Sequence, residues 1–343
     1  MPAPRRGREY PGSYAEMRAW FPDDRACLDY LDWLRWPAGF VCPQCGASRS
    51  WVLPDGRRSC AGCGRRVSVT AGTIFHRTRT PLTVWFAVAW NITTAKNGMS
   101  ALGLRRVLGI GSYQTAWAML HRYRTAMIRP GRDRLRGDVE VDESAFGGPR
   151  AGKPGRGAAG KVLVAIAVER YEPAGFGRCR LGIIPDASGI SLRAFLAANV
   201  EPGSTIITDG WRAYPSAVGT DYTHDPFNIS ASGLPAHLPL PGVHRVAALV
   251  KRWLLGTHQG AVEGDHLQAY LDEFTFRFNR RKSDARGMLF FRLLQQAVVS
   301  APLSYADLVV LGKPKSTKPV PPERHRLGPG SLATGHPVRP WRS

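Results

Sequence analysis

The sequence predicts an α/β fold in which helices flank a mixed sheet, preceded by a small zinc ribbon and a helical region. The sheet is predicted from apolar runs of strand length at 138–142, 161–170, 177–188 and 204–209. The flanking helices are predicted from apolar residues that recur every three or four positions at 190–200, 243–258, 266–281 and 287–300. The ribbon is predicted from two closely spaced pairs of cysteines near the N-terminus.

The composition favours a polyanionic partner. The 343 residues include 47 Lys and Arg against 26 Asp and Glu, which gives a net charge of +21. Nucleic acid is the expected partner of so basic a chain, although a general compositional bias toward arginine accounts for part of the excess. The sequence has no apolar run of membrane-spanning length and no secretory signal, so we expect a cytoplasmic, nucleoid-associated protein without membrane contact.

Changes in composition and periodicity predict five segments. A Gly/Lys/Arg-rich loop at 151–161 is expected to face phosphate, and the Pro- and Gly-rich stretch 215–242 gives no clear strand. The C-terminal tail is basic and lacks a core-forming pattern, which predicts disorder. The segments are an N-terminal helical segment at 1–37, a zinc ribbon at 38–76, a helix-turn-helix-like region at 77–130, the α/β domain at 131–300 and the tail at 301–343.

Four of the six cysteines form the sequences CPQC and CAGC, separated by fourteen residues. Two such turns together offer the four thiolates that a structural Zn²⁺ prefers. A redox motif is the alternative, and it does not explain two copies. We therefore predict a structural zinc site at Cys42, Cys45, Cys60 and Cys63, and we interpret Cys27 as a small core residue.

Residues 96–128 have the pattern of a helix-turn-helix. Ser100 and Ser112 are expected to cap two helices, which the Gly-Ile-Gly turn at 109–111 separates. The second helix would offer Gln114, Arg122 and Arg124 to DNA. The alternative is a plain helical hairpin with no contact to DNA.

Two apolar strands each end in an aspartate, Asp142 and Asp209. A charge in such a place is costly unless it is exposed or bound to a cation. Cutting a phosphodiester requires help at two oxygens, which carboxylate-bound Mg²⁺ or Mn²⁺ supplies. By strand alternation, Glu140 shares a face with Asp142 whereas Glu143 points away. The alternative for each acid is a solvated position at a strand end.

The predicted helix at 243–258 has two distinct sides. On a helical wheel, Lys251 lies within about 20° of His244, two turns away. The opposite side carries the apolar residues Val246, Leu249, Val250 and Trp253. Lys251, and with it Arg252, would be placed to contact DNA phosphates. The alternative is an ordinary solvated helix face.

These motifs resemble those of insertion-sequence transposases with an N-terminal zinc ribbon and an ISXO2-like, DDE-type catalytic domain of RNase H-like fold. The resemblance implies that Asp142, Asp209 and His244 are the three catalytic positions and that Lys251 is the basic residue downstream. Most DDE enzymes have Glu at the third position, so Glu263 and Glu273 are possible substitutes for His244. The resemblance extends from about Phe21 to Phe291 and includes VDESAFGG, ITDGWRAY, HRVAALVKRWLLGTHQG and LQAYLDEFTFRFNRR.

The resemblance implies a DNA transposase. It would bind terminal inverted repeats, cut phosphodiester bonds with Mg²⁺ or Mn²⁺ and join the 3′ end to target DNA, as a homodimer or larger assembly. Arg277, Arg280 and Arg281 would offer further contacts to DNA. The alternatives are a catalytically inactive, domesticated DNA-binding regulator, which the non-acidic His244 favours, and a structure-specific nuclease.

Overall fold

The computed structural model describes residues 4–147, 161–171, 173, 175–227, 240–260, 262 and 264–311. Most of the predicted phosphate-facing loop at 151–161, the alternative acid Glu263 and the C-terminal stretch 312–343 lie outside these residues.

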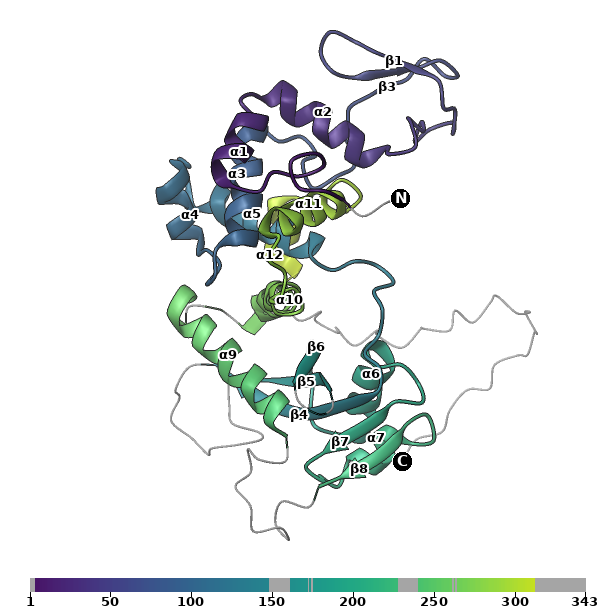
Figure 1. Cartoon of the computed structure of the whole chain (residues 1–343), viewed down its shortest axis with the longest axis vertical. Helices are drawn as coiled ribbons and strands as arrows, with labels where there is room; N and C mark the ends of the chain where they lie inside the picture. The colour runs from purple at the N-terminus through teal and green to yellow at the C-terminus, as the bar shows by residue number, and fades with distance from the viewer. Residues whose placement is uncertain are drawn as a thin grey trace, which may run out of the picture. The chain divides into compact units, whose positions relative to one another are not determined.

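The ribbon contains a three-stranded antiparallel sheet in the order β1-β2-β3. Cys60 ends the central strand, and Phe40, Cys42, Cys60 and Val67 form a small core. A core this small needs a further stabilising element, which the cysteines can supply by binding metal. The strands are β1 (Ser50–Val52), β2 (Arg58–Cys60) and β3 (Arg66–Val67) (Figure 1).

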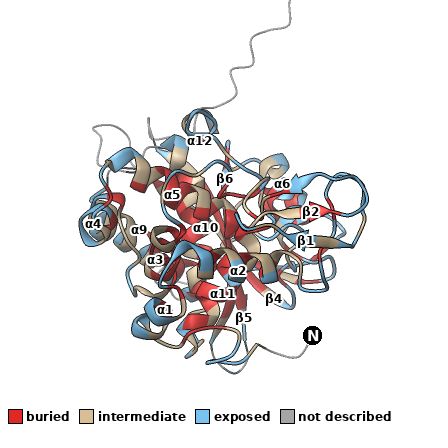
Figure 2. Ribbon diagram, turned by 90° about the horizontal axis from the view of Figure 1, so that it is seen from above, coloured by how far each residue is buried: buried red, intermediate tan, exposed pale blue. Residues whose placement is uncertain are grey.

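Helices from both ends of the sequence share one hydrophobic core. Its centre is the apolar helix α3, whose Trp85 and Phe86 are fully buried. Helix α11 packs against α3, α2 and α5, so it lies in this helical core although its residues fall in the predicted segment 131–300 (Figure 2). The helices are α1 (Tyr14–Trp20), α2 (Asp24–Arg35), α3 (Leu82–Thr94), α4 (Ala101–Leu108), α5 (Tyr113–Ala126) and α11 (Arg286–Ala297).

A five-stranded mixed sheet follows, in the order β6-β5-β4-β7-β8. The first three strands along the chain pair antiparallel, and β7 and β8 join the other side of β4 in parallel. The predicted α/β class with a mixed sheet is therefore confirmed. The strands are β4 (Asp138–Phe146), β5 (Val162–Arg170), β6 (Phe176–Ile184), β7 (Thr205–Thr208) and β8 (Thr223–Pro226).

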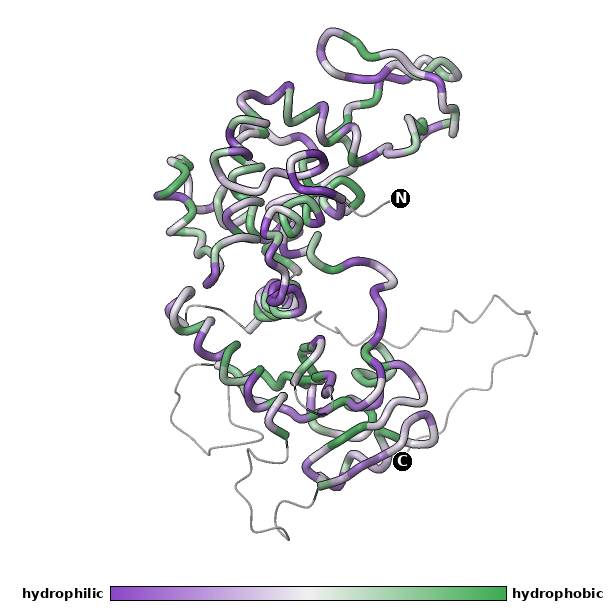
Figure 3. Tube along the Cα trace, viewed as in Figure 1, coloured by the Kyte–Doolittle hydropathy of each residue, from purple (hydrophilic) through white to green (hydrophobic). Residues whose placement is uncertain are grey.

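Helices cover both faces of this sheet, which explains why β5 is apolar at nearly every position. Val139 and Val141 of β4 face α6 and α7, whereas Phe146 and the alternate residues of β5 face α9 and α10. Hydrophobic stretches run through these strands in Figure 3. The covering helices are α6 (Gly189–Asn199), α7 (Tyr214–Val218), α9 (Pro241–His258) and α10 (Leu267–Phe278), the last preceded by the short 3-10 helix η1 (Gly264–His266).

The segment after α11 differs from the prediction of a disordered tail from residue 301. Residues Tyr305–Leu311 form helix α12, which packs against α5. The rings of Tyr305 and Trp117 lie 5.9 Å apart, and the carbonyl of Leu303 accepts a hydrogen bond from Arg122. The prediction is wrong here because these contacts, remote in sequence, order the segment. Among the described helices, none is both long and apolar enough to span a membrane.

Candidate metal centre and active site

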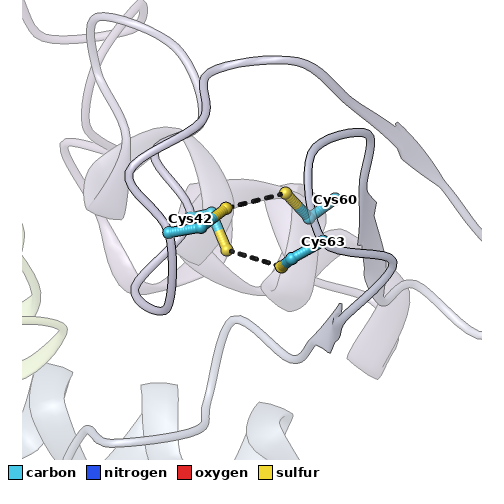
Figure 4. Close-up of side chains that lie close together, drawn as sticks. Cys42, Cys60 and Cys63 are labelled. Atoms are coloured by element: carbon cyan, nitrogen blue, oxygen red, sulfur yellow. Dashed lines mark hydrogen bonds between the residues drawn. The ribbon is translucent and has the colours of Figure 1, made fainter.

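The four predicted cysteine ligands converge at one point of the ribbon (Figure 4). The Sγ atoms of Cys42 and Cys63 lie 3.8 Å apart, and those of Cys45 and Cys60 lie 3.6 Å apart. Tetrahedral Zn²⁺ with bonds of about 2.3 Å requires sulfur atoms about 3.8 Å apart, so the spacing fits this ion.

The thiol of Cys42 is prepared for metal binding by the backbone. The N–H groups of Cys45 and Gln44 point at its sulfur and lower the pKa of Cys42 to about 6. The thiolate is the form that binds metal. Four cysteines complete a tetrahedron, so this centre suits a structural role and leaves no position open for catalysis.

The pairing of β4 with β7 brings the segments that carry the two predicted aspartates side by side. The strands are parallel, with Asp138 opposite Thr205 and Glu140 opposite Ile207, two residues before each aspartate. Both aspartate side chains are half-buried. Asp209 directly follows β7, whereas Asp142 lies in the middle of β4, which continues to Phe146 beyond the predicted strand end at 142.

A tight turn fixes Asp209. Its Oδ1 accepts the N–H of Trp211 at 3.0 Å, and Gly210 between them has φ +75°, a conformation that favours glycine. The buried Thr208 accepts the N–H of Gly210 at 3.2 Å and also bonds the Nε2 of His224, on β8, at 3.0 Å. Hydrogen bonds from Asp209 and from Thr208 thus both stabilise the turn.

Glu140 joins the start of α9 to β4. Its Oε2 accepts the backbone N–H groups of Gly242 at 2.7 Å and Val243 at 3.0 Å, and its side chain is fully buried. A carboxylate is stabilised at a helix N-terminus, where these N–H groups have no other partner. Burial raises the pKa of Glu140, whereas the two N–H groups lower it. The contact places His244, in the first turn of α9, close to the strand that carries Asp142.

Further along α9, Lys251 also reaches β4. Its Nζ donates to the Oγ of Ser144 at 2.8 Å and lies 5.3 Å from the centre of the Phe146 ring. Burial lowers the pKa of Lys251, Lys161 lowers it further, and Asp142 raises it. The faces predicted from the helical wheel agree with the burial of Val246 and Val250.

The opposite face of β4 holds a residue that the sequence reasoning missed. Tyr214, at the start of α7, is fully buried beside the acids. Burial raises the pKa of Tyr214, and the charges of Glu143, Asp142 and Asp209 raise it further. The alternation of β4 could have predicted a partner for Glu143, but nothing in the sequence indicates which residue it is.

The candidate catalytic side chains are less closely grouped than the four cysteines. Within the described residues, the four cysteines are the only group of three or more possible ligands whose donor atoms all lie within 4.8 Å of one another. Asp142, Asp209 and His244 do not form such a group. Looser spacing of the two carboxylates is compatible with Mg²⁺, which binds one or two carboxylates and keeps several waters.

The predicted DNA-reading helix α5 is largely covered by other helices. Arg124 is 1% exposed, and its Nε donates to Glu273 of α10 at 2.8 Å. The half-buried Arg122 donates to the carbonyl of Leu303 at 2.8 Å. The prediction that Arg124 contacts DNA is therefore wrong, since its guanidinium compensates a buried carboxylate. Gln114, in the first turn of α5, is exposed.

The arginines of α10 and the turn that follows it also make internal contacts. Arg281 donates to the carbonyls of Phe176 and Gly177 of β6, and Arg277 donates to those of Ala95 and Lys96. The side chains of Arg277 and Arg281 therefore bind other parts of the fold and stabilise it. The alternative acid Glu273 is likewise buried between Arg124 and Arg277. Arg252 of α9 is exposed, and Arg280 is half-buried.

Both parts of the chain match known protein families. Residues 134–279, which include the whole mixed sheet and α9, match the ISXO2-like transposase domain, and residues 22–66 match the transposase zinc-ribbon domain. A Halobacterium salinarum protein described as an uncharacterized protein in transposable element ISH50 is 26% identical over 280 residues, covering 75% of this chain and 91% of that protein. No solved structure matches the chain.

Proposed function

Because the chain belongs to the insertion-sequence transposases that join a zinc ribbon to an ISXO2-like domain, we propose that it cuts DNA at the ends of its element and joins the freed 3′ end to target DNA. The observation that carries this proposal is the parallel pairing of β4 with β7, whose register, continued by two residues, would set Asp142 beside Asp209. Neighbouring carboxylates on adjacent strands are the kind of ligand that divalent-metal phosphodiester chemistry needs.

In this proposal, Asp142 and Asp209 would hold Mg²⁺ or Mn²⁺, which when bound would help to activate the nucleophile and to stabilise the leaving oxygen. His244 completes the site from the first turn of α9, where neutral imidazole can accept a proton or favour Mn²⁺ over Mg²⁺. Lys251 orients a DNA phosphate from its place beside Ser144. Glu140 acts on none of these groups directly and keeps α9 against β4.

The remaining parts serve recognition in the same proposal. The zinc ribbon holds a structural Zn²⁺, and the exposed Gln114 and Arg252 contact DNA together with Arg280. The half-buried Arg122 contributes only if its bond to Leu303 breaks. The DNA partners are the terminal inverted repeats and the target, held by a dimer or larger assembly in the nucleoid-associated cytoplasm.

The test is cleavage of duplex DNA that carries the sequences flanking the gene, with Mg²⁺ or Mn²⁺. We expect Asp142→Ala and Asp209→Ala to lower the rate by more than about 100-fold, because even residues that only support metal ligands cost 10- to 100-fold. The matched control is Asp138→Asn, at the start of the same strand, which should cleave normally. Full activity of both alanine variants would overturn the proposal.

The variant His244→Glu separates the roles of the third position. A carboxylate suits Mg²⁺ better than imidazole does, so we expect the ratio of Mg²⁺- to Mn²⁺-supported cleavage to rise. An unchanged ratio would mean that His244 is not a ligand. Sequence-specific binding without cleavage by the wild type would favour a regulator.

A further inference from the structure

A second cleft lies away from the candidate active site, where the end of α5 meets β6, α10 and α11. Its volume is about 670 Å³, and Asp133 is the one acid among the described residues that line it. None of Asp142, Asp209, His244 or Lys251 lines it, and β6 lies two strands from β4 in the sheet. Its arginines are Arg129, Arg132, Arg178, Arg180, Arg280 and Arg292.

The positive charge of this cleft is only partly compensated. Arg129 pairs with Asp133 at 3.3 Å, and Arg178 pairs with Glu169 at 2.6 Å. For the other four arginines, no carboxylate of the described residues lies within 4.0 Å. Like charges that line one cleft repel each other, so an anion would stabilise the cleft.

Arg180 shows the imbalance most clearly, because it is only 4% exposed. Its guanidinium donates to the carbonyls of Cys179 at 2.9 Å and Asp133 at 2.6 Å, and its buried Nε has no partner among the described residues. Burying a cation without a counter-ion is costly. Burial first, and then the charges of Arg132 and Arg178, lower the pKa of Arg180 to about 10.

Arg280 contributes a guanidinium of fixed orientation. It stacks on the ring of Phe276 at 3.9 Å and donates to the carbonyl of the same residue at 3.0 Å. These contacts immobilise the side chain in advance, so less conformational entropy is lost when it binds an anion. The exposed Arg292 also lines the cleft, from α11.

We propose that this arginine cleft binds the phosphate backbone of DNA at a distance from the residues that cut it. Phosphate supplies the missing negative charge and offers oxygens that planar guanidinium groups match in pairs. The volume lies within the roughly 300–1,000 Å³ of sites for drug-sized ligands, which suits a stretch of backbone better than a single ion. The choice of DNA as the source of phosphate rests on the proposed function, whereas the affinity for an anion does not.

The test is the salt dependence of DNA binding by the full chain. The main variant is Arg129→Gln/Arg292→Gln, because both side chains are exposed and the fold should survive. The control is Arg18→Gln/Arg25→Gln, which removes the same charge from exposed positions on α1 and α2. Each lost phosphate contact reduces the magnitude of the slope of log affinity against log salt by about 0.9. For the main variant we therefore expect this magnitude to fall by about one to two and DNA binding to weaken about tenfold.

A third variant tests geometry rather than charge. Arg280→Lys keeps the charge but loses the planar fork, so it should weaken binding several-fold while the control pair does not. An equal loss in the main variant and the control pair would overturn the proposal, since it would show a general effect of charge. An unchanged salt slope in the main variant would also overturn it.

A second measurement separates DNA from small phosphate. Inorganic phosphate should raise the thermal midpoint of the wild type more than that of Arg129→Gln/Arg292→Gln. If this happens while DNA binding by the variant is unchanged, the cleft takes a small phosphate and the DNA proposal fails. Asp142 does not line the cleft, so a failure of the cleavage test of Asp142→Ala and a failure of this binding test would be recognised separately.

Discussion

Helices α5 and α9 have similar sequences in one respect, because each carries basic residues and at least one histidine among apolar ones. In α5, Arg124 and His121 are buried, at 1% and 3% exposure. In α9, Arg245, Lys251 and Arg252 stay exposed. Helix α9 has one buried side and one exposed side, whereas α5 is buried on most of its surface.

The difference comes from what packs on each helix. Helix α9 contacts the sheet mainly through one side, whereas α5 contacts α3, α4, α10, α11 and α12. The partner of Arg124 is Glu273, 149 positions away in the sequence. A basic residue in a helix is therefore a guide to DNA binding only when no distant segment brings a carboxylate to it. Four experiments test this contrast.

The largest expected effect is on α5. Arg124→Met would leave Glu273, which is fully buried, with only the weaker contact to Arg277 at 3.5 Å. Removing one partner of a buried ion pair costs about 3–5 kcal/mol of unfolding free energy. Urea denaturation of the purified protein measures this loss.

The control for Arg124 is Arg252→Met on α9. Its side chain is exposed, so we expect a change within about 0.5 kcal/mol. If Arg124→Met instead keeps full stability and binds DNA more weakly, the contrast between the helices disappears and α5 is a DNA-reading helix after all.

The next effect concerns the attachment of α9. In Gly242→Ala, the new Cβ would lie 2.8 Å from Oε2 of Glu140 and 2.8 Å from the ring of Phe176. The first turn of α9, which carries His244, must then move away from β4. Supporting residues of this kind cost 10- to 100-fold in activity, so we expect the cleavage rate to fall by about that factor.

Gly256→Ala on the same helix is the matched control, because its Cβ would meet no atom within 4 Å. Replacing a glycine inside a helix should stabilise the protein by about 0.5–1 kcal/mol without changing cleavage. Equal cleavage by the two variants would show that the Glu140 contact does not position the site.

The third effect is a loss of stability at acidic pH, caused by His121 of α5. Burial first, and then Arg124, His266 and His258, lower the pKa of His121 to about 2. In the unfolded chain His121 binds a proton as the pH falls below about 6.5, whereas in the folded chain it stays neutral there. The contribution of His121 to the free energy of unfolding is therefore constant above that pH and falls below it. At pH 5 this costs about 2 kcal/mol.

His121→Gln should therefore reduce the loss of stability between pH 7 and pH 5, measured by urea denaturation at each pH. It should not abolish the loss, because burial also lowers the pKa of His258 to about 3. His76→Gln, at an exposed position, should leave the pH dependence unchanged. The same pH dependence in wild type and His121→Gln would mean that His121 is not buried in solution.

The elements that depend on local pattern were predictable. The two CxxC pairs bring their thiols together through short turns, and the apolar runs of β5 and β7 gave strands at the expected places. The stretch 215–242 gave no strand signal, yet it contains β8, whose sequence Thr-His-Asp-Pro has no apolar alternation. Edge pairing to β7, rather than side-chain pattern, makes this segment a strand.

The site was predictable only in part. Asp142 and Asp209 follow apolar runs, and the helical wheel placed His244 and Lys251 on one side of α9. The capping of α9 by Glu140 was not predictable, because it depends on where a helix from 102 positions away begins on the sheet. The internal partners of Arg124, Arg277 and Arg281 were missed for the same reason.

The smallest expected effect is on the pH dependence of cleavage and depends on Lys251. Burial lowers the pKa of its ammonium group, so this lysine loses its charge at a lower pH than an exposed lysine does. If Lys251 orients a phosphate, wild-type cleavage should fall a few-fold on the alkaline side. Lys251→Arg should remove this fall, because a guanidinium keeps its charge there. The measurement is kcat/KM from pH 7 to pH 10, with Arg245→Lys, at another exposed position of α9, as the matched control. An alkaline fall in kcat/KM of the same size in Lys251→Arg would assign the titration to another group. Lys251 would then have no role in catalysis, and this side of α9 would be an ordinary solvated helix face.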